Sequence, residues 1–290
     1  MDETYLDSEL EKLIARVSQL AMFRVEASRM FKRHEAEICE HHRQLPDWSV
    51  SKTEGHSYHF YYRSPSTGED VPAKSRRLNV VDQLEFNTLQ HMKTYQWLLA
   101  EAYEVFEDFV ENAYAYCGLH GLPLWVPPKG GVALKPTTLE GYRTLKYPDR
   151  VRTPHRQLKA FRANSNHFAR CETGEMTRTN YRAVFALIAK LRQDIVHEGG
   201  YTRDLNSMIV SIQNLVSETD KVQMRGYIKT FFAKHNGSHL IDLLPISSEN
   251  KDGSPNGCYH ETMDALFRVL VEYARLIVET IHGATTEPGR

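Results

Sequence analysis

The sequence predicts a mainly α-helical protein, a bundle of long antiparallel helices with one small inserted β-hairpin. Apolar residues recur at three- and four-residue spacing over two very long segments and over a third near the C-terminus. One short segment between the first two instead has a period of two. With 290 residues, 41% of them hydrophobic, the chain can bury a substantial core and could hold one elaborated domain or two small ones; we expect a single elaborated domain over 1–290.

The two long helices are expected at 6–42 and 81–116. In the first, Leu13 and Leu20 belong to a regular apolar stripe, and Pro46 closes the segment. The second has an equally regular stripe. The first helix is long enough to pair with another long helix, and the two are expected to lie antiparallel in one bundle.

The segment 46–80 separates the two helices and is expected to form a β-hairpin. Tyr58, Phe60 and Tyr62 occupy one side of an alternating pattern, and the residues between them occupy the other. The Ser-Pro-Ser-Thr-Gly sequence at 64–68 has the chemistry of a turn. The hairpin would therefore be an insertion in the helical bundle.

The rest of the chain alternates between irregular and helical segments. A proline- and glycine-rich insertion is expected at 119–141, a loop at 247–257 and a flexible tail at 284–290. Helical spacing of apolar residues predicts further helices at 179–197, 204–216, 221–234 and 260–282.

The helix that starts at 179 carries the most informative residues near its C-terminal end. Arg192 and His197 follow its apolar face, and Gly199 and Gly200 are suited to stop the helix just after the histidine. Five residues of α-helix rotate by about 140°, so Arg192 lies at the edge of the apolar face and His197 on the far side. His197 is therefore not expected in the core.

An arginine and a histidine in this arrangement suit RNA cleavage without a metal. The reaction needs a base for the ribose 2′-hydroxyl, an acid for the leaving 5′-oxygen and a cation for the phosphoryl oxygens. Histidine titrates near neutrality, and a guanidinium can bind two phosphate oxygens at once. The structural alternatives are a surface ion pair of Arg192 with Asp194 or Glu198, and a His197 that only caps the helix.

This segment resembles the HEPN superfamily, whose ribonuclease members carry an R-x4-6-H motif near the end of a long helix. Arg192 and His197 match that motif, and the stretch 98–111, with Phe106-Glu107-Asp108-Phe109, is similar to an earlier long helix of these domains. The resemblance implies an HEPN-like bundle that acts as a homodimer, with two motifs facing one cleft. It also implies a metal-independent endoribonuclease that leaves 2′,3′-cyclic phosphate and 5′-hydroxyl ends.

The biological role implied by the resemblance is that of a toxin or antiviral defence effector, held in check by a neutralising or regulatory partner. The alternative is a non-catalytic HEPN-type homodimeric module that binds RNA, a nucleotide or a protein. Gln193 favours this alternative, because the family frequently has Asn, Asp or His directly after the motif arginine.

Basic residues gather ahead of the motif helix, between 143 and 170, where Asp149 is the only acid. Phosphate contacts supply most sequence-independent affinity for nucleic acid, so this stripe predicts an RNA-binding surface. The alternative is a solvated face balanced by acids elsewhere in the fold. The members of the basic stripe are Arg143, Lys146, Arg150, Arg152, Arg156, Lys159, Arg162 and Arg170.

Four acidic residues are candidates to support the motif pair. Glu107 or Asp108 could orient Arg192, and Asp194 or Glu198 could set the tautomer of His197. The alternative for each is an ordinary exposed carboxylate.

Composition predicts a cytoplasmic protein with no membrane partner, no cofactor and no metal. The net charge is −1, no apolar run is long enough to span a membrane, and the acidic N-terminus is unlike a signal peptide. The four cysteines are far apart, which favours reduced thiols. Paired histidines at 41–42 and at 56 and 59 lack a further ligand at a suitable spacing for zinc.

Overall fold

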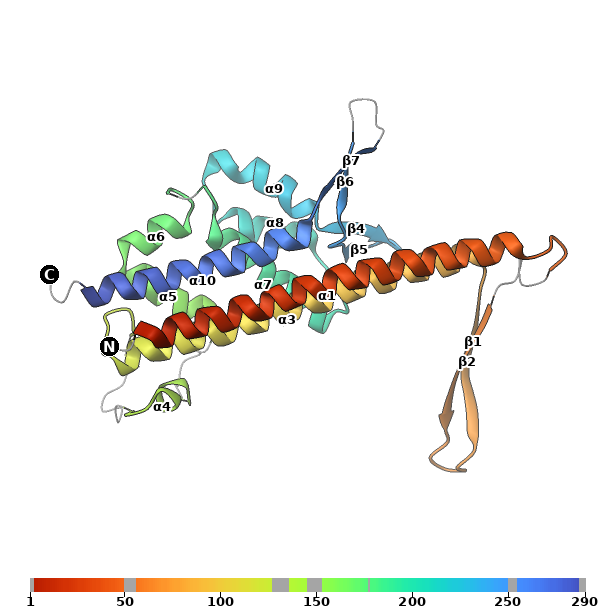
Figure 1. Cartoon of the computed structure of the whole chain (residues 1–290), viewed down its shortest axis with the longest axis horizontal. Helices are drawn as coiled ribbons and strands as arrows, with labels where there is room; N and C mark the ends of the chain where they lie inside the picture. The colour runs from red at the N-terminus through yellow and green to blue at the C-terminus, as the bar shows by residue number, and fades with distance from the viewer. Residues whose placement is uncertain are drawn as a thin grey trace. The chain divides into compact units, whose positions relative to one another are not determined.

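The computed structural model describes residues 3–49, 56–126, 136–144, 153–176, 178–249 and 255–286. These residues are mainly helical, as predicted, with small antiparallel sheets (Figure 1). The chain divides into two compact units: residues 1–22 together with 95–290 form the first unit, and residues 23–94 form the second.

The helices of the described residues are α1 (Glu3–Gln44), α3 (Val80–Leu119), α4 (Leu139–Thr144), α5 (Pro154–Asn164), α6 (Asn166–Glu172), α7 (Tyr181–His197), α8 (Leu205–Gln213), α9 (Lys221–Lys229) and α10 (Thr262–Thr286). The strands pair as β1 (His56–Arg63) with β2 (Asp70–Leu78), as β3 (Tyr201–Thr202) and β4 (Phe232–His235) on either side of β5 (Ser238–Ile241), and as β6 (Ile246–Glu249) with β7 (Pro255–His260). None of the helices in this part of the chain is long and apolar enough to span a membrane.

The strongly periodic helices are confirmed as α1, α3, α7 and α10. In the first unit, α1 and α3 lie antiparallel (Figure 1): the Asn112 amide donates to Glu9 Oε2 over 2.7 Å, and Arg16 forms a salt bridge with Glu101. Their buried apolar residues, such as Leu13 of α1, belong to the same core as those of α7 and α10.

The centre of that core is an aromatic cluster around Tyr273 of α10, which is completely buried. Its ring centroid lies 5.7 Å from those of Phe106 and Tyr181, 5.8 Å from that of Phe185 and 6.0 Å from that of Phe168. Tyr181 and Phe185 belong to α7, so the cluster fixes the buried face of that helix and thereby the direction of its exposed face.

A buried carboxylate ties three helices together beside this cluster. Glu172 of α6 has no exposed surface, and it accepts hydrogen bonds from the Tyr273 hydroxyl and from Arg162 Nε of α5. Burial alone would lower the pKa of Arg162, but the hydrogen bond and charge of Glu172 raise it on balance. Burial, followed by the charge of Glu172, raises the pKa of Tyr273 well above its ordinary value. Arg162 and Glu172 therefore form a charged pair inside the fold.

The second unit contains the hairpin and the adjoining parts of α1 and α3. The predicted hairpin is confirmed as β1 and β2, paired antiparallel (Figure 1). The two helices are joined here by the buried Asn87 amide, which donates to the Phe31 carbonyl over 3.1 Å. The Phe31 ring stacks on His91, and burial, followed by the charge of Lys32, lowers the pKa of His91 to about 4.

The prediction of a helix over 221–234 is wrong beyond Lys229, because Phe232–His235 forms strand β4. β4 turns directly into β5 through Asn236 and Gly237, whose φ angles are +48° and +78°. An Asn-Gly pair favours such a tight hairpin turn, and its sequence signal outweighs the weak helical periodicity here. The helix expected at 204–216 is present as α8, which ends at Gln213.

The loop predicted at 247–257 is also wrong in part, because β6 and β7 pair across it. A ladder of backbone hydrogen bonds needs no apolar side chains, so turn-like composition hides such a hairpin. Residues 250–254, like 127–135 of the proline-rich insertion and 287–290 of the tail, lie outside the described residues. The structure adds α4 at the end of that insertion and continues α10 to Thr286, into the segment expected as tail.

Candidate active site

The C-terminal end of α7 is shaped by two glycines, as the sequence predicts. The Asp194 carbonyl accepts the N–H groups of both Glu198 and Gly200, each over 2.9 Å. Gly199 and Gly200 have φ angles of +61° and +82°, which lead the chain out of the helix. His197 is consequently the last helical residue, and its side chain is exposed.

Gly200 also fixes the end of α7 to the surrounding fold. Its carbonyl accepts the Ile241 N–H over 2.9 Å, and the Gln96 amide of α3 donates to the Ile241 carbonyl over 2.6 Å. A Cβ atom built on Gly200 would lie 2.1 Å from Gln96 Oε1. This position therefore requires glycine both for its backbone angle and for the close approach of Gln96.

Gly200→Ala is expected to lower the free energy of unfolding by about 2–5 kcal/mol, since the left-handed backbone costs about 1–2 kcal/mol and the overlap with Gln96 adds about 1–3. Urea denaturation with a fixed m-value measures this loss. Gly199→Ala is the matched control, because a Cβ there meets nothing within 4 Å although φ is also positive. Equal losses in the two variants would show that the Gln96 contact does not matter.

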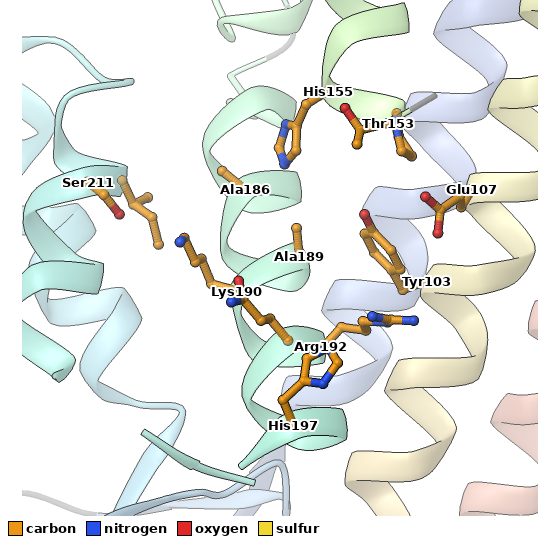
Figure 2. Close-up of a pocket in the computed structure, with 13 residues that line it drawn as sticks. Tyr103, Glu107, Thr153, His155, Ala186, Ala189, Lys190, Arg192, His197 and Ser211 are labelled. Carbon is orange, nitrogen blue, oxygen red and sulfur yellow. The ribbon is translucent and has the colours of Figure 1, made fainter. Parts of the chain in front are cut away.

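Arg192 and His197 line one cavity of about 530 Å³, between α3, α7, the start of α5 and the C-terminal end of α8 (Figure 2). The structure thus brings the two sequence-predicted catalytic residues to the same hollow. The remaining lining residues that carry a charged, titratable or hydroxyl group are Tyr103, Glu107, Thr153, His155, Lys190 and Ser211.

Arg192 is held against α3 by two neighbours. Its Nη2 donates to Glu104 Oε1 over 3.0 Å, and its Cζ lies 5.9 Å from the centre of the Tyr103 ring. The side chain is only 27% exposed, and its buried Nε has no hydrogen-bond partner within the described ranges. A partly desolvated guanidinium that lines a cavity is well suited to bind an anion there.

The acid that contacts Arg192 is Glu104, which the sequence interpretation missed. Glu107 lies one turn further along the same face of α3 and lines the cavity. Burial, followed by the charge of Glu111, raises the pKa of Glu107, and Arg192 partly offsets this increase. Helical spacing could have found Glu104, because Glu104 and Glu107 share one face.

Asp194 and Glu198 contact residues in β3 and just after it. The Asp194 carboxylate accepts the Thr202 hydroxyl; burial raises its pKa, and this hydrogen bond lowers it in part. Glu198 Oε2 pairs with Arg203 Nη2 over 2.7 Å. Within the described part of the chain neither carboxylate hydrogen-bonds to His197, so their expected role in setting its tautomer finds no support in the geometry.

His155 is a second histidine of the cavity that sequence reasoning did not select. Its ring packs on Phe185, with 5.0 Å between centroids, and burial is the main cause of its lowered pKa, ahead of the charge of Arg162. Phe185 and Arg192 are seven residues apart, a rise of roughly 10 Å along α7. Figure 2 accordingly shows His155 beside Ala186 and His197 beyond Arg192, at the other end of the cavity.

The basic stripe is less uniformly positive than its sequence suggests, because several of its side chains pair with acids. Among its described members, Arg162 is bound to the buried Glu172, Arg170 Nε pairs with Glu175 over 3.1 Å, and Arg143 lies 3.9 Å from Glu111. These pairings support the alternative of a charge-balanced face. The exposed basic side chains that continue along α5 are Arg156 and Lys159, and Lys146, Arg150 and Arg152 lie outside the described residues.

The described residues contain no group of three or more His, Cys, Asp or Glu side chains arranged to hold a metal ion. Comparisons of the chain with protein-family models, with characterised proteins and with solved structures found no match.

Proposed function

We propose that the protein is a metal-independent endoribonuclease of the HEPN type, with Arg192 and His197 as its catalytic pair. The single observation that supports this most is their shared cavity, in which the buried Nε of Arg192 lacks a partner among the described residues. A phosphate oxygen that enters the cavity can accept a charge-assisted hydrogen bond from this guanidinium.

In the proposed reaction the ribose 2′-oxygen attacks the adjacent phosphorus as His197 accepts its proton. The bond from phosphorus to the 5′-oxygen breaks as this oxygen takes a proton from the imidazolium of the second chain's copy of the same histidine, and Arg192 stabilises the negative charge on the phosphoryl oxygens. The products are a 2′,3′-cyclic phosphate and a 5′-hydroxyl. The nearby Tyr103, whose pKa burial raises to about 12, remains a neutral hydrogen-bond donor throughout.

A homodimer belongs to this proposal, because one histidine cannot easily serve both proton transfers at once. His155 does not supply the second group in this proposal, since it lies at the other end of the cavity from His197 (Figure 2). His197 is exposed at the helix end, where a second chain can face it. A cytoplasmic role as a toxin or antiviral defence effector, with a regulatory partner, is part of the same proposal.

The proposal is tested by incubating the purified protein with total cellular RNA in EDTA and analysing the fragment ends. We expect fragments with 2′,3′-cyclic phosphate and 5′-hydroxyl ends, and a specific activity that falls when the protein is diluted below its dimer dissociation constant. Cleavage only with added divalent metal, or 5′-phosphate products, would overturn the mechanism.

The second candidate is a non-catalytic homodimeric module that binds RNA, a nucleotide or a protein through the same cavity. The salt bridge between Arg192 and Glu104 favours it, because this carboxylate competes with phosphate for the guanidinium. RNA that stays intact but is bound by a folded wild type would select this candidate.

A further inference from the structure

The β1–β2 hairpin exposes large aromatic side chains that cover no core. Phe60, Tyr61 and Tyr62 are 67%, 56% and 47% exposed. All of β2 except Val71 and Leu78 is exposed as well. A two-stranded ribbon has little stability of its own in water, so side chains of this size on its surface point to a binding task.

One side of this ribbon combines aromatic rings with positive charges. Strand alternation places Phe60 and Tyr62 on the same face of β1, and the register sets Lys74 of β2 directly opposite Phe60. Arg76, two residues from Lys74, lies on that face too. We call Phe60, Tyr62, Lys74 and Arg76 the aromatic–basic face.

The cations of this face are available to a ligand. Lys74 and Arg76 are exposed and form no salt bridge with any other described residue. The acids of the hairpin, Glu69 and Asp70, stand at its turn, away from Arg76. The ribbon is thus positively charged along the part that carries the rings.

The opposite face of the ribbon is organised differently. His59 Nδ1 hydrogen-bonds to Ser75 Oγ over 2.7 Å, and its ring lies 6.1 Å from that of Tyr61. Arg63 Nε donates to the Gly68 carbonyl over 2.8 Å, within the turn. Polar groups of this face are therefore already engaged inside the hairpin, whereas the two cations of the aromatic–basic face are not.

We propose that the aromatic–basic face binds single-stranded RNA, with bases stacked on Phe60 and Tyr62 and phosphates contacting Lys74 and Arg76. Aromatic rings stack on any unpaired base, and neighbouring cations complement the phosphate charge. The bases of a duplex are already stacked on one another and cannot accept these rings. The choice of RNA rests on the proposed function; the preference for unpaired strands rests on the face itself.

The test measures binding of a fluorescein-labelled, 2′-O-methylated single-stranded RNA 20-mer by fluorescence anisotropy. Methylation removes the attacking hydroxyl, so binding is measured without cleavage. Phe60→Leu/Tyr62→Leu is expected to raise Kd about tenfold or more, because the stacking surfaces are lost. Lys74→Gln/Arg76→Gln keeps both rings and is expected to make the salt dependence shallower by about 1.4 in log Kd per log salt, for two lost phosphate contacts.

The matched control is Tyr61→Leu, which removes a ring from the opposite face and is expected to change Kd less than twofold. A duplex of the same sequence should bind the wild type more weakly than the single strand. The inference is overturned if the wild type does not bind, if both double variants bind as well as the wild type, if Tyr61→Leu weakens binding equally, or if the variants change the oligomeric state instead.

The cleavage assay separates this inference from the proposed function. If total RNA is cleaved in EDTA but the face variants bind normally, the inference fails and the nuclease stands. If RNA is never cleaved but the single strand binds through this face, the nuclease proposal fails and the RNA-binding ribbon stands.

Discussion

His197→Ala is expected to slow RNA cleavage by about 10²–10⁴-fold, the range for losing one general acid–base group. Arg192→Ala is expected to cost about 10²–10³-fold, because it removes a positioned donor to the developing phosphoryl charge. Arg192→Lys should recover only part of this loss, since an ammonium keeps the charge but not the planar fork. The measurement is the initial rate of cleavage of a fluorogenic single-stranded RNA in EDTA.

The controls for these variants are an arginine and a histidine outside the cavity. Arg203→Ala removes an exposed arginine that pairs with Glu198, and His34→Ala removes an exposed histidine near Glu37. Both should cleave within about twofold of the wild type. If the cavity variants retain wild-type rates while their urea midpoints are unchanged, Arg192 and His197 are not the catalytic pair, and other residues carry out the cleavage.

The helices that build the site could be predicted because each follows a strong local pattern. The apolar stripe of α7 set its buried face, and the glycines at 199 and 200 set its end, so the positions of Arg192 and His197 on that helix followed from spacing alone. The stripes of α1, α3 and α10 were equally regular, and these helices form the core behind the site.

The contact partners of the site residues could not be predicted from the sequence in this way, because they come from other helices. Glu104 reaches Arg192 from α3, and His155 enters the cavity from the start of α5. Periodicity says which face of a helix is buried but not which neighbour covers it. The same limit applies to Arg162, which looks like a surface cation in the sequence and is paired with an interior carboxylate in the fold.

The short strands were missed for a different reason. Half of the residues of β4 and β5 are apolar, and the two strands pair across the turn at Asn236 and Gly237. Four-residue strands give too few positions to establish a period of two, so a turn motif is the stronger indicator. An interpretation that gave Asn-Gly its full weight would have placed this hairpin correctly.

Glu172→Ala is expected to lower the free energy of unfolding by about 3–5 kcal/mol, because it leaves Arg162 as an uncompensated charge inside the fold. The Tyr273 hydroxyl also loses its acceptor among the packed rings around it. Tyr273→Phe removes one hydrogen bond to the same carboxylate but keeps the ion pair, so its expected loss is smaller, about 1.5–3 kcal/mol. Urea denaturation of each variant against the wild type measures both values.

Glu175→Ala is the matched control, since its carboxylate pairs with Arg170 and both side chains are more than half exposed. An exposed pair of this kind contributes about 0–1 kcal/mol, so the control should unfold almost as the wild type does. Tyr273 packs on Tyr181 and Phe185 of α7. Loss of the hydrogen bond between Tyr273 and Glu172 should therefore also disturb the helix that carries Arg192. A stable Glu172→Ala protein with full activity would mean that the buried ion pair neither holds the fold nor supports that helix.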